Sequence, residues 1–501
     1  MEYTPMLRQY LQIKQNYQDA ILFFRLGDFY EMFFEDAEVA SRELEIVLTA
    51  RDGGKGIKVP MCGVPHHAAE SYLVRLIEKN YKVAVCEQVE LPGESKGIVR
   101  REVTRVVTPG TIMAGQALED KTHNYLIAVV PVDDVIGMAC TDVTTGHFMV
   151  TSFSGSSANE SLFDELIRLR PKEVLIPRKD ILKGLENKEF LVTIIESRTC
   201  ELSRAKRILY RHYGERWKVT GINHCTGMIC AAGALLTYLY DTQKHELAQI
   251  RDINIYSTGH FMMLDAVTRR NLEITESIID GGRQGTLFSV LDHSCTAMGA
   301  RMLRGWLEQP LMDLTEINRR LDGVEALNKN IFLRESLRKL LVPVYDLERL
   351  GGRVAAGAAN PKDMVCLRQS LALIPQIKEL LINEETEYLK DIAVQMDILG
   401  DIYQLLDKAI VDQPPLLLRE GGIIKPGYSE EIDRLRQAST DYKAWLAEME
   451  TAEKQRTGIK SLKIGYNKVF GYYIEITRSN LDQVPDDYIR KQTLVNAERF
   501  I

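Results

Sequence analysis

Short apolar runs alternate with amphipathic ones over the first hundred residues. Three runs have the β-branched and aromatic content of strands, at residues 20–26, 58–65 and 81–89. Apolar positions at helical spacing predict helices from about 28 to 44 and from 69 to 79. The segment 96–107 adds a strand rich in lysine and arginine, and Thr108-Pro109-Gly110 ends it. This order of elements predicts a small mixed α/β domain over residues 1–110.

Three further strand-like runs follow, separated by short turn sequences. They occupy residues 124–132, 135–143 and 146–154. Asp133-Asp134 and Thr145-Gly146 are typical of hairpin turns, so the three runs predict an antiparallel meander. Helices and two more strands, EVLIP and FLVTII, continue the pattern to about residue 255. An antiparallel start followed by helices predicts a second α/β domain over 120–255, with a ribonuclease-H-like topology.

Strand patterns nearly vanish after Tyr256, and helical periodicity continues to residue 426. One stretch places five apolar residues on a single helical face: Ile317, Leu321, Val324, Leu327 and Ile331. A second helix, which ends at Pro310, places three more on one face: Met302, Leu303 and Trp306. We interpret both faces as the core of a packed helical bundle over 256–426.

A long helix is predicted from Ser429 to about Arg456. Its apolar residues follow heptad a and d positions, namely Ile432, Leu435, Tyr442, Leu446 and Met449. This pattern indicates a helix that packs against one neighbour and faces water on its other side. The helix stops at Thr457-Gly458, and two strand-like runs joined near Asn467-Lys468 follow. A hairpin at the end of a helical arm, carrying Lys463, Asn467 and Lys468, could reach a phosphate backbone.

Composition narrows the protein class. The 501 residues are 45% hydrophobic and 27% charged, and no apolar run approaches the roughly 20 residues that a membrane span needs. The polar first twenty residues do not resemble a secretory signal, so we expect a cytoplasmic protein. Eight cysteines without C-x-x-C spacing indicate free thiols rather than a disulfide framework. The net charge of −7 means that any nucleic-acid role must rest on local basic patches.

Motifs for catalysis or metal binding are weak. No G-x-x-x-x-G-K-[ST] phosphate loop occurs in the sequence. Two His/Cys groups lack the paired spacing of a zinc site and are interpreted as packed side chains: His224, Cys225 and Cys230, and Cys62, His66 and His67. A magnesium-dependent nuclease is one alternative, and its carboxylates would be Asp142, Glu160, Asp164 and Glu165. An architectural scaffold that binds partner proteins through the helical arm is a second alternative.

The stretch ILFFRLGDFYEMFFED, residues 21–36, is dense in aromatic and charged residues. Its Gly27-Asp28 pair is interpreted as a strand-to-helix turn in which Asp28 caps the helix. Most of the rings are assigned to the domain core: Phe23, Phe24, Phe33 and Phe34. Phe29 and Glu31 fall in the first helical turn and need not face that core. The nearby basic residues Arg51, Lys55 and Lys58 favour an exposed, nucleic-acid-facing role for this ring.

Several motifs taken together resemble the MutS family of bacterial DNA mismatch repair proteins. They run in order along the chain: RLGDFYEMF, PMCGVPHHAAESYL, VAVCEQV, REVTRVVTPGT, DAVTRRNLEIT, GARMLRGWL, GYYIEITRSN and RKQTLVNAERFI. The resemblance implies a multidomain α/β plus α protein. Its parts would be a mismatch-recognition domain (1–110), a connector (120–255), a helical core with long lever helices (256–426), a clamp inserted in that core (427–485) and a return into the core (486–501).

The resemblance also implies a function and a site. In the family, an aromatic-x-glutamate pair enters the minor groove at a mismatch, and the matching residues are Phe29 and Glu31. The implied partner is double-stranded DNA with mismatches or small loops. The candidates for contacts with the DNA backbone or minor groove are Arg51, Lys58, Met61, Arg105, Lys463, Asn467 and Lys468.

The family's ATPase domain has no counterpart in these residues. We therefore expect this chain not to be an enzyme, and we expect ATP and magnesium to belong to that further domain. Because the family's dimer contacts lie mostly there, the homodimer is expected to be weak or absent here. A MutL-type repair partner is also implied. The sequence does not identify which mismatches are preferred.

Overall fold

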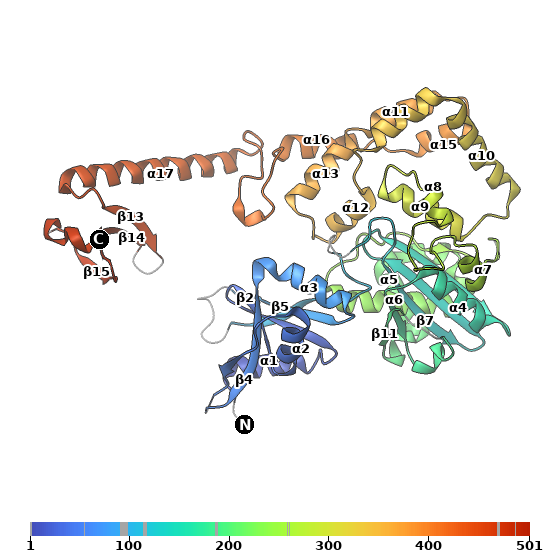
Figure 1. The fold of residues 1–501 in the computed structure, drawn as a ribbon, viewed down its shortest axis with the longest axis horizontal. Coiled ribbons are helices and arrows are strands. Elements are labelled where there is room, and N and C mark those ends of the chain that lie inside the picture. The colour runs from blue at the N-terminus through green and yellow to red at the C-terminus, as the bar shows by residue number, and fades with distance from the viewer. Residues whose placement is uncertain are drawn as a thin grey trace. The chain divides into compact units, whose positions relative to one another are not determined.

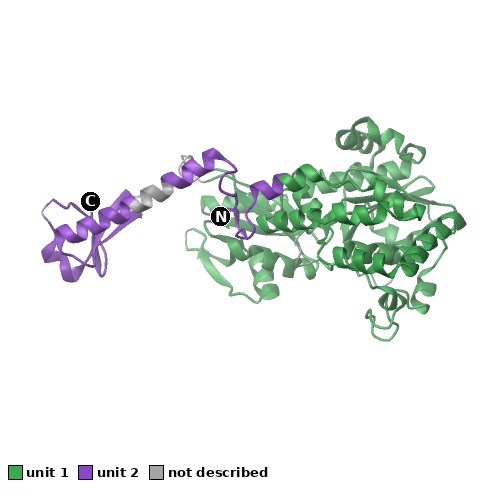
Figure 2. Ribbon diagram, turned by 90° about the horizontal axis from the view of Figure 1, so that it is seen from above, with its two compact units in different colours: residues 1–404 green, residues 405–501 purple. Residues whose placement is uncertain are grey.

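The chain divides into two compact units, residues 1–404 and 405–501 (Figure 2). The computed structural model describes residues 3–54, 56–90, 99–113, 118–185, 189–257, 259, 261–467, 471–485 and 487–501. Among them, no helix combines the length and apolar character needed to cross a membrane.

A six-stranded sheet with the order β3-β4-β2-β1-β5-β6 forms the N-terminal domain. Its strands are β1 (Ala20–Leu26), β2 (Phe29–Phe33), β3 (Thr49–Asp52), β4 (Lys58–Pro65), β5 (Lys82–Gln88) and β6 (Arg101–Val107). Only β1 and β5 pair in parallel. Helix α1 (Pro5–Lys14) packs on one face, and α2 (Glu35–Leu44) and α3 (Ala69–Glu78) pack on the other. Figure 1 labels the three helices beside this sheet. The predicted mixed α/β domain is confirmed.

The prediction of one helix from 28 to 44 is wrong at its start. Residues 29–33 form β2, which pairs with β1 in the register Leu26↔Phe29. Gly27 and Asp28 are thus the two-residue turn of a β-hairpin, and Gly27 adopts a φ of 58°, which suits glycine. Asp28 does not cap a helix, because α2 begins only at Glu35. The aromatic residues of FYEMF favour a strand, and pairing with both β1 and β4 satisfies that preference.

A second six-stranded sheet has the order β11-β10-β7-β8-β9-β12. Its strands are β7 (Tyr125–Val132), β8 (Val135–Asp142), β9 (His147–Ser154), β10 (Glu173–Ile176), β11 (Leu191–Ile194) and β12 (Asn254–Ile255). The predicted antiparallel meander is confirmed in β7, β8 and β9. Strands β10 and β11 then add parallel to β7 on its other side.

Helices cover both faces of this second sheet. Helix α4 (Ala158–Leu169) packs on one face, and α5 (Leu202–Tyr213) and α6 (Thr226–Gln243) pack on the other. Helix α6 approaches so closely that a Cβ on Gly137 would lie 2.0 Å from the carbonyl oxygen of Gly227. The domain therefore has two buried hydrophobic layers around one sheet.

Helices dominate from residue 266 to 409, as predicted. They are α7 (Ala266–Asn271), α8 (Leu287–Leu291), α9 (Ala297–Glu308), α10 (Leu314–Lys329), α11 (Ile331–Leu341), α12 (Leu347–Ala355), α13 (Pro361–Leu371), α14 (Ile374–Ile382), α15 (Glu387–Gln395) and α16 (Gly400–Ala409). A core of buried residues unites α11, α14 and α15, with Leu337, Leu381 and Ala393 among its members.

The faces predicted to line the bundle core are buried only in part, although the helices themselves are present. Leu327 of α10 packs against the buried cluster, while other members of the two faces are exposed. On α10, Leu321 is 56% exposed and Val324 is 61% exposed. The buried contact is made instead by Gly323, whose Cβ position would lie 2.5 Å from the ring of Tyr388. On α9, Met302 is 60% exposed. Apolar periodicity identifies one face of a helix, but it does not say what packs against that face.

The second unit contains a long helix and a four-stranded sheet. Helix α17 (Glu430–Thr457) begins after the cap Ser429 and ends at Gly458, which has a left-handed φ of 73°. The sheet has the order β13-β14-β16-β15, from β13 (Lys463–Asn467), β14 (Gly471–Thr477), β15 (Arg490–Thr493) and β16 (Ala497–Phe500). The predicted helix and hairpin are confirmed.

Two details of this unit differ from expectation. Residues 486–501 were expected to return into the helical core; within them, β16 pairs with β14 and β15 pairs with β16 in this sheet. Leu435 of the predicted heptad seam is 65% exposed. The apolar pattern along the helix predicted a packed seam, but a pattern within one helix does not identify a neighbouring element that packs against that seam.

Candidate nucleic-acid interface

Strand β2 places Phe29 and Glu31 on one face of the N-terminal sheet. Side chains alternate along a strand, and the intervening Tyr30 and the following Met32 are buried on the opposite face. Phe29 is the first residue after the hairpin turn, and its ring is 47% exposed. The expectation that this pair need not face the core therefore agrees with the structure, but the element that presents it is a strand.

The opposite end of the same strand face is covered by helix α1. Phe33 lies four positions beyond Phe29 and is fully buried. The ring of Tyr10 on α1 contacts it edge-on at a centroid distance of 5.1 Å. Phe24, the cross-strand partner of Glu31, is also buried in this cluster. Phe29 and Phe33 lie on one face of one strand, and they differ in solvent exposure because α1 covers only Phe33.

Glu31 lies across a glycine on the neighbouring strand. Its cross-strand partner on β4 is Gly63, where a Cβ would lie 3.5 Å from Glu31 Cγ and 3.3 Å from the Tyr30 carbonyl oxygen. The Glu31 carboxylate accepts a hydrogen bond from the guanidinium of Arg51 on β3, and the two form an ion pair. Sequence reasoning missed both Gly63 and this pairing. The available signal was a glycine inside a strand run, which often marks a close approach.

The opposite sheet face holds a separate polar cluster. Tyr30 donates a hydrogen bond to Glu87, and its ring lies 5.5 Å from that of His66. Burial, together with the hydrogen bond to Glu87, raises the pKa of Tyr30 well above its usual value. Arg105 belongs to this face because it pairs with Val85, and it bonds Glu70 at 2.9 Å. The structure does not bring Arg105 together with Phe29.

Two further candidates lie on β4. Met61 shares the face of Phe29, but it pairs with Phe33 and packs in the cluster under α1. It is four residues from Pro65, the partner of Phe29, which is about 13 Å along a strand. Lys58 is exposed at the start of β4, opposite Asp52 on β3. Lys55 lies outside the described residues.

The hairpin of the second unit carries the remaining candidates. Lys463 is exposed at the start of β13, and the backbone of Asn467 pairs with Gly471 at its end. Lys468 lies outside the described residues. The rings of Tyr466 and Tyr472 lie 4.9 Å apart and are 60% and 43% exposed. Sequence reasoning missed this tyrosine pair, although a tyrosine in each strand-like run beside the turn was a signal.

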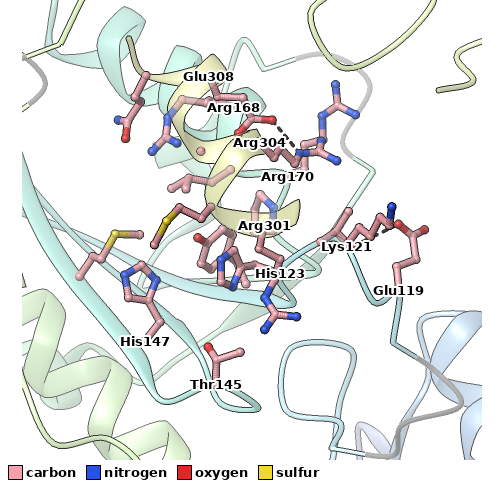
Figure 3. Close-up of a pocket in the computed structure, with 18 of the residues that line it drawn as sticks. Glu119, Lys121, His123, Thr145, His147, Arg168, Arg170, Arg301, Arg304 and Glu308 are labelled. Atoms are coloured by element: carbon pink, nitrogen blue, oxygen red, sulfur yellow. Dashed lines mark hydrogen bonds and ion pairs between the residues drawn. The ribbon is translucent and has the colours of Figure 1, made fainter. Parts of the chain in front are cut away.

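A cleft of about 1310 Å³ lies within the first unit, between the second sheet and helix α9 (Figure 3). Many arginines line it, and several are paired with acidic side chains. Arg170 forms an ion pair with Glu276, and Arg304 bonds Glu308 at 2.8 Å. Figure 3 shows Arg304 and Arg170 close together in this cleft. These acidic side chains therefore neutralise part of the positive charge of the cleft.

Three of the four carboxylates of the nuclease alternative are engaged in structural contacts, and the fourth, Glu160, is exposed. Asp142 is fully buried and accepts hydrogen bonds from His123 at 2.9 Å and from the Asn124 and Thr144 backbones. Although burial opposes ionisation, these bonds lower the pKa of Asp142. Glu165 bonds Arg168 and Tyr256, while Asp164 accepts from the Ala266 amide. Across the described ranges, no three His, Cys, Asp or Glu side chains converge in a metal-binding group. The described residues therefore give no support to the nuclease alternative.

Comparison with known proteins gives one consistent result. Three family models match successive parts of the chain: MutS domain I over residues 4–116, MutS domain II over 124–251 and MutS domain III over 267–483. The DNA mismatch repair protein MutS of Pelotomaculum thermopropionicum is 54% identical over 99% of this chain and 58% of its own length. That of Desulforamulus reducens is 51% identical over 100% of this chain and 58% of its own length. The chain therefore spans somewhat more than half the length of these relatives.

Proposed function

Because the chain belongs to the MutS family of DNA mismatch repair proteins, we propose that it recognises mismatched or unpaired bases in double-stranded DNA. Recognition would be the first step of repair. The observation that carries this proposal is a half-exposed phenylalanine beside a carboxylate, both held on one strand next to a tight turn. The strand that carries both residues is paired with a neighbouring strand on each side.

Phe29 acts as the wedge in this mechanism. A side chain that enters the minor groove between base steps partly unstacks them, which costs a few kcal/mol in matched DNA and less at a mismatch. This mechanism requires that the ring is exposed and that the backbone carrying it keeps its position when the ring enters the base stack. Its pairing with both β1 and β4 supports the second requirement. The protein then detects local deformability rather than a base sequence.

Glu31 acts as the reader of the displaced base. It follows two positions after Phe29, about 7 Å along the strand and on the same face. Its carboxylate accepts a hydrogen bond from a ring N–H or, when protonated, donates one to a ring nitrogen. In a matched duplex those base edges are already paired, so the carboxylate meets mostly acceptors and is repelled.

Backbone contacts would hold the kinked duplex. Arg51 and Lys58 on the β3–β4 hairpin are the candidates in the N-terminal domain, since both are accessible. Lys463, Asn467 and Lys468 are the candidates on the hairpin of the second unit. Contacts of this kind position the protein and carry no sequence information themselves.

The other regions take their proposed roles from the family. Residues 120–255 would form a connector with a ribonuclease-H-like topology. Residues 256–426 would form the core and lever helices, and residues 427–485 the clamp. ATP hydrolysis with magnesium, a stable homodimer and a MutL-type partner are proposed for the full length of the relatives.

Fluorescence anisotropy at several salt concentrations tests this function, with one mismatched duplex and its matched control. Phe29→Ala is expected to remove most of the mismatch preference, at least about fivefold, since ring stacking on a base contributes roughly 1–3 kcal/mol. Ile194→Ala is the matched control, because Ile194 is equally exposed at 47% but lies on β11 of the second domain. Lys463→Ala should weaken both duplexes alike and reduce the salt slope by about one.

Two results would contradict the proposal. Equal mismatch preference with and without the Phe29 ring would exclude the wedge. Equal affinity of the parent protein for both duplexes would favour the architectural scaffold.

A further inference from the structure

We propose that Arg51 is a latch on Glu31, which it holds across strand β4 in the free protein and releases when a DNA phosphate takes its guanidinium. The inference rests on the proposed mismatch-recognition function and adds a specificity-determining residue to it. It starts from the ion pair between the two side chains.

In the free protein the pair engages one carboxylate oxygen of Glu31 and so restricts its access to a base. Glu31 comes from β2 and Arg51 from β3, and β4 lies between these strands. The glutamate side chain reaches across β4 at Gly63, where the absence of a side chain leaves room for it. Only 17% of the Glu31 side chain is exposed, compared with 41% of Arg51. The arginine is therefore the more accessible member of the pair.

Arg51 does not form its ion pair with the acidic residue that is nearest in the sequence. Asp52 is the next residue, but its carboxylate accepts a hydrogen bond from the Gly54 amide within the hairpin loop. Alternation along β3 also points neighbouring side chains to opposite faces of the sheet. Arg51 thus reaches a carboxylate two strands away, on the same face as Phe29.

The chemistry of guanidinium allows the exchange. Its planar N–H donors fit a carboxylate or a phosphate equally well, so a phosphate can replace Glu31 as the partner. Once Arg51 leaves, the carboxylate is free to meet a base beside the inserted ring. At a mismatch the base replaces the lost hydrogen bond. On matched DNA nothing replaces it, and the released anion lies among phosphates. The latch therefore increases discrimination.

A double-mutant cycle on matched DNA tests the release. The four proteins are the parent, Glu31→Gln, Arg51→Gln and the double variant, each as the full chain. If binding breaks the ion pair, Glu31→Gln removes two costs of binding: the repulsion between the carboxylate and the DNA phosphates, and the loss of the ion pair with Arg51. In the Arg51→Gln background it removes the repulsion alone. The gain in affinity from Glu31→Gln should therefore be about two- to fivefold larger when Arg51 is present, as for a partly exposed pair.

Either other result of the cycle overturns the latch. Equal gains in the two backgrounds mean that the residues act independently. A smaller gain with Arg51 present means that the pair persists on DNA and shields the carboxylate. Because the cycle uses only matched DNA, it is separate from the Phe29→Ala test, in which an unchanged mismatch preference would contradict the proposed function itself.

A measurement without DNA tests the latched state. Phenylglyoxal modifies accessible guanidinium groups, and peptide mass spectrometry gives the rate at each arginine. Glu31→Gln should speed the modification of Arg51 and leave Arg42 unchanged. Arg42 is a suitable control because it pairs with Glu43 at 3.0 Å in the same domain. An unchanged rate at Arg51 would show that Glu31 does not hold it.

Discussion

Two phenylalanines on one strand face should differ sharply in what they contribute to stability. Phe29 and Phe33 both lie on β2 and are four residues apart. Phe29 is 47% exposed, while Phe33 is fully buried under Tyr10 of α1. The perturbation is the same in both cases, truncation of the ring to alanine. A ring that leaves the protein to enter DNA must contribute little to the fold it leaves.

The structure sets the expected magnitudes. Full burial of a phenylalanine side chain contributes about 1.5–3 kcal/mol, so the half-buried Phe29 should contribute roughly 1 kcal/mol. Its loss leaves no enclosed cavity, because the site is open to water. Phe33→Ala empties a closed site, and such changes cost about 3–5 kcal/mol. The two variants should therefore differ by roughly 2–4 kcal/mol in the free energy of opening this sheet.

Native-state hydrogen exchange read by mass spectrometry is the appropriate assay. A chain with several domains does not unfold in one step, so one global free energy is undefined, whereas peptides from β1 and β5 report their own domain. Phe33→Ala should accelerate exchange in these strands strongly and Phe29→Ala only slightly. Equal acceleration would refute the reasoning, because it would make Phe29 a core residue that cannot leave without opening the sheet.

Two further predictions concern the first unit. Gly352→Ala on α12 would place a Cβ 2.0 Å from the Thr144 carbonyl oxygen and should destabilise this contact by about 1–3 kcal/mol in exchange measurements. Gly351→Ala meets no atom within 4 Å and should stabilise the helix by up to about 1 kcal/mol, and similar effects of both changes would contradict the close approach. Although burial opposes ionisation, hydrogen bonds from Lys121 and other donors lower the pKa of Asp292 to about 2. A carboxyl group with a depressed pKa stabilises the fold at pH values above its unfolded pKa of about 3.9, and this stabilisation is lost as the pH falls toward 2. Hydrogen exchange near Lys121 should therefore become faster over that pH interval, and Asp292→Asn should make this increase smaller.

Local patterns predicted most of the elements in this chain. The short turns of the meander and the capped helix that ends at Gly458 are encoded by neighbouring residues, and both are present in the structure. The same holds for the hairpin that follows this helix. Turn chemistry, capping and apolar period act over a few residues, so a reader of the sequence can recognise them.

Two predictions failed for a common physical reason. Gly27-Asp28 is compatible both with a helix start and with a two-residue hairpin, and pairing of β2 with β4, about thirty residues away, favours the strand. The apolar face of α10 was predicted correctly as a face, but Gly323 rather than Val324 meets Tyr388 of α15. Both outcomes depend on segments distant in the sequence.

The sequence by itself determined that Phe29 and Glu31 are the residues to consider, and their motif placed the chain in its family. Tertiary structure decided how they are presented. Cross-strand pairing put them on one face, α1 left only Phe29 uncovered, and β3 brought Arg51 to the carboxylate. Neither Arg51 nor Gly63 is near Glu31 in the chain, so no local pattern could reveal that they share one site. The chemistry of a site follows from residue types, but its geometry follows from strand order and register.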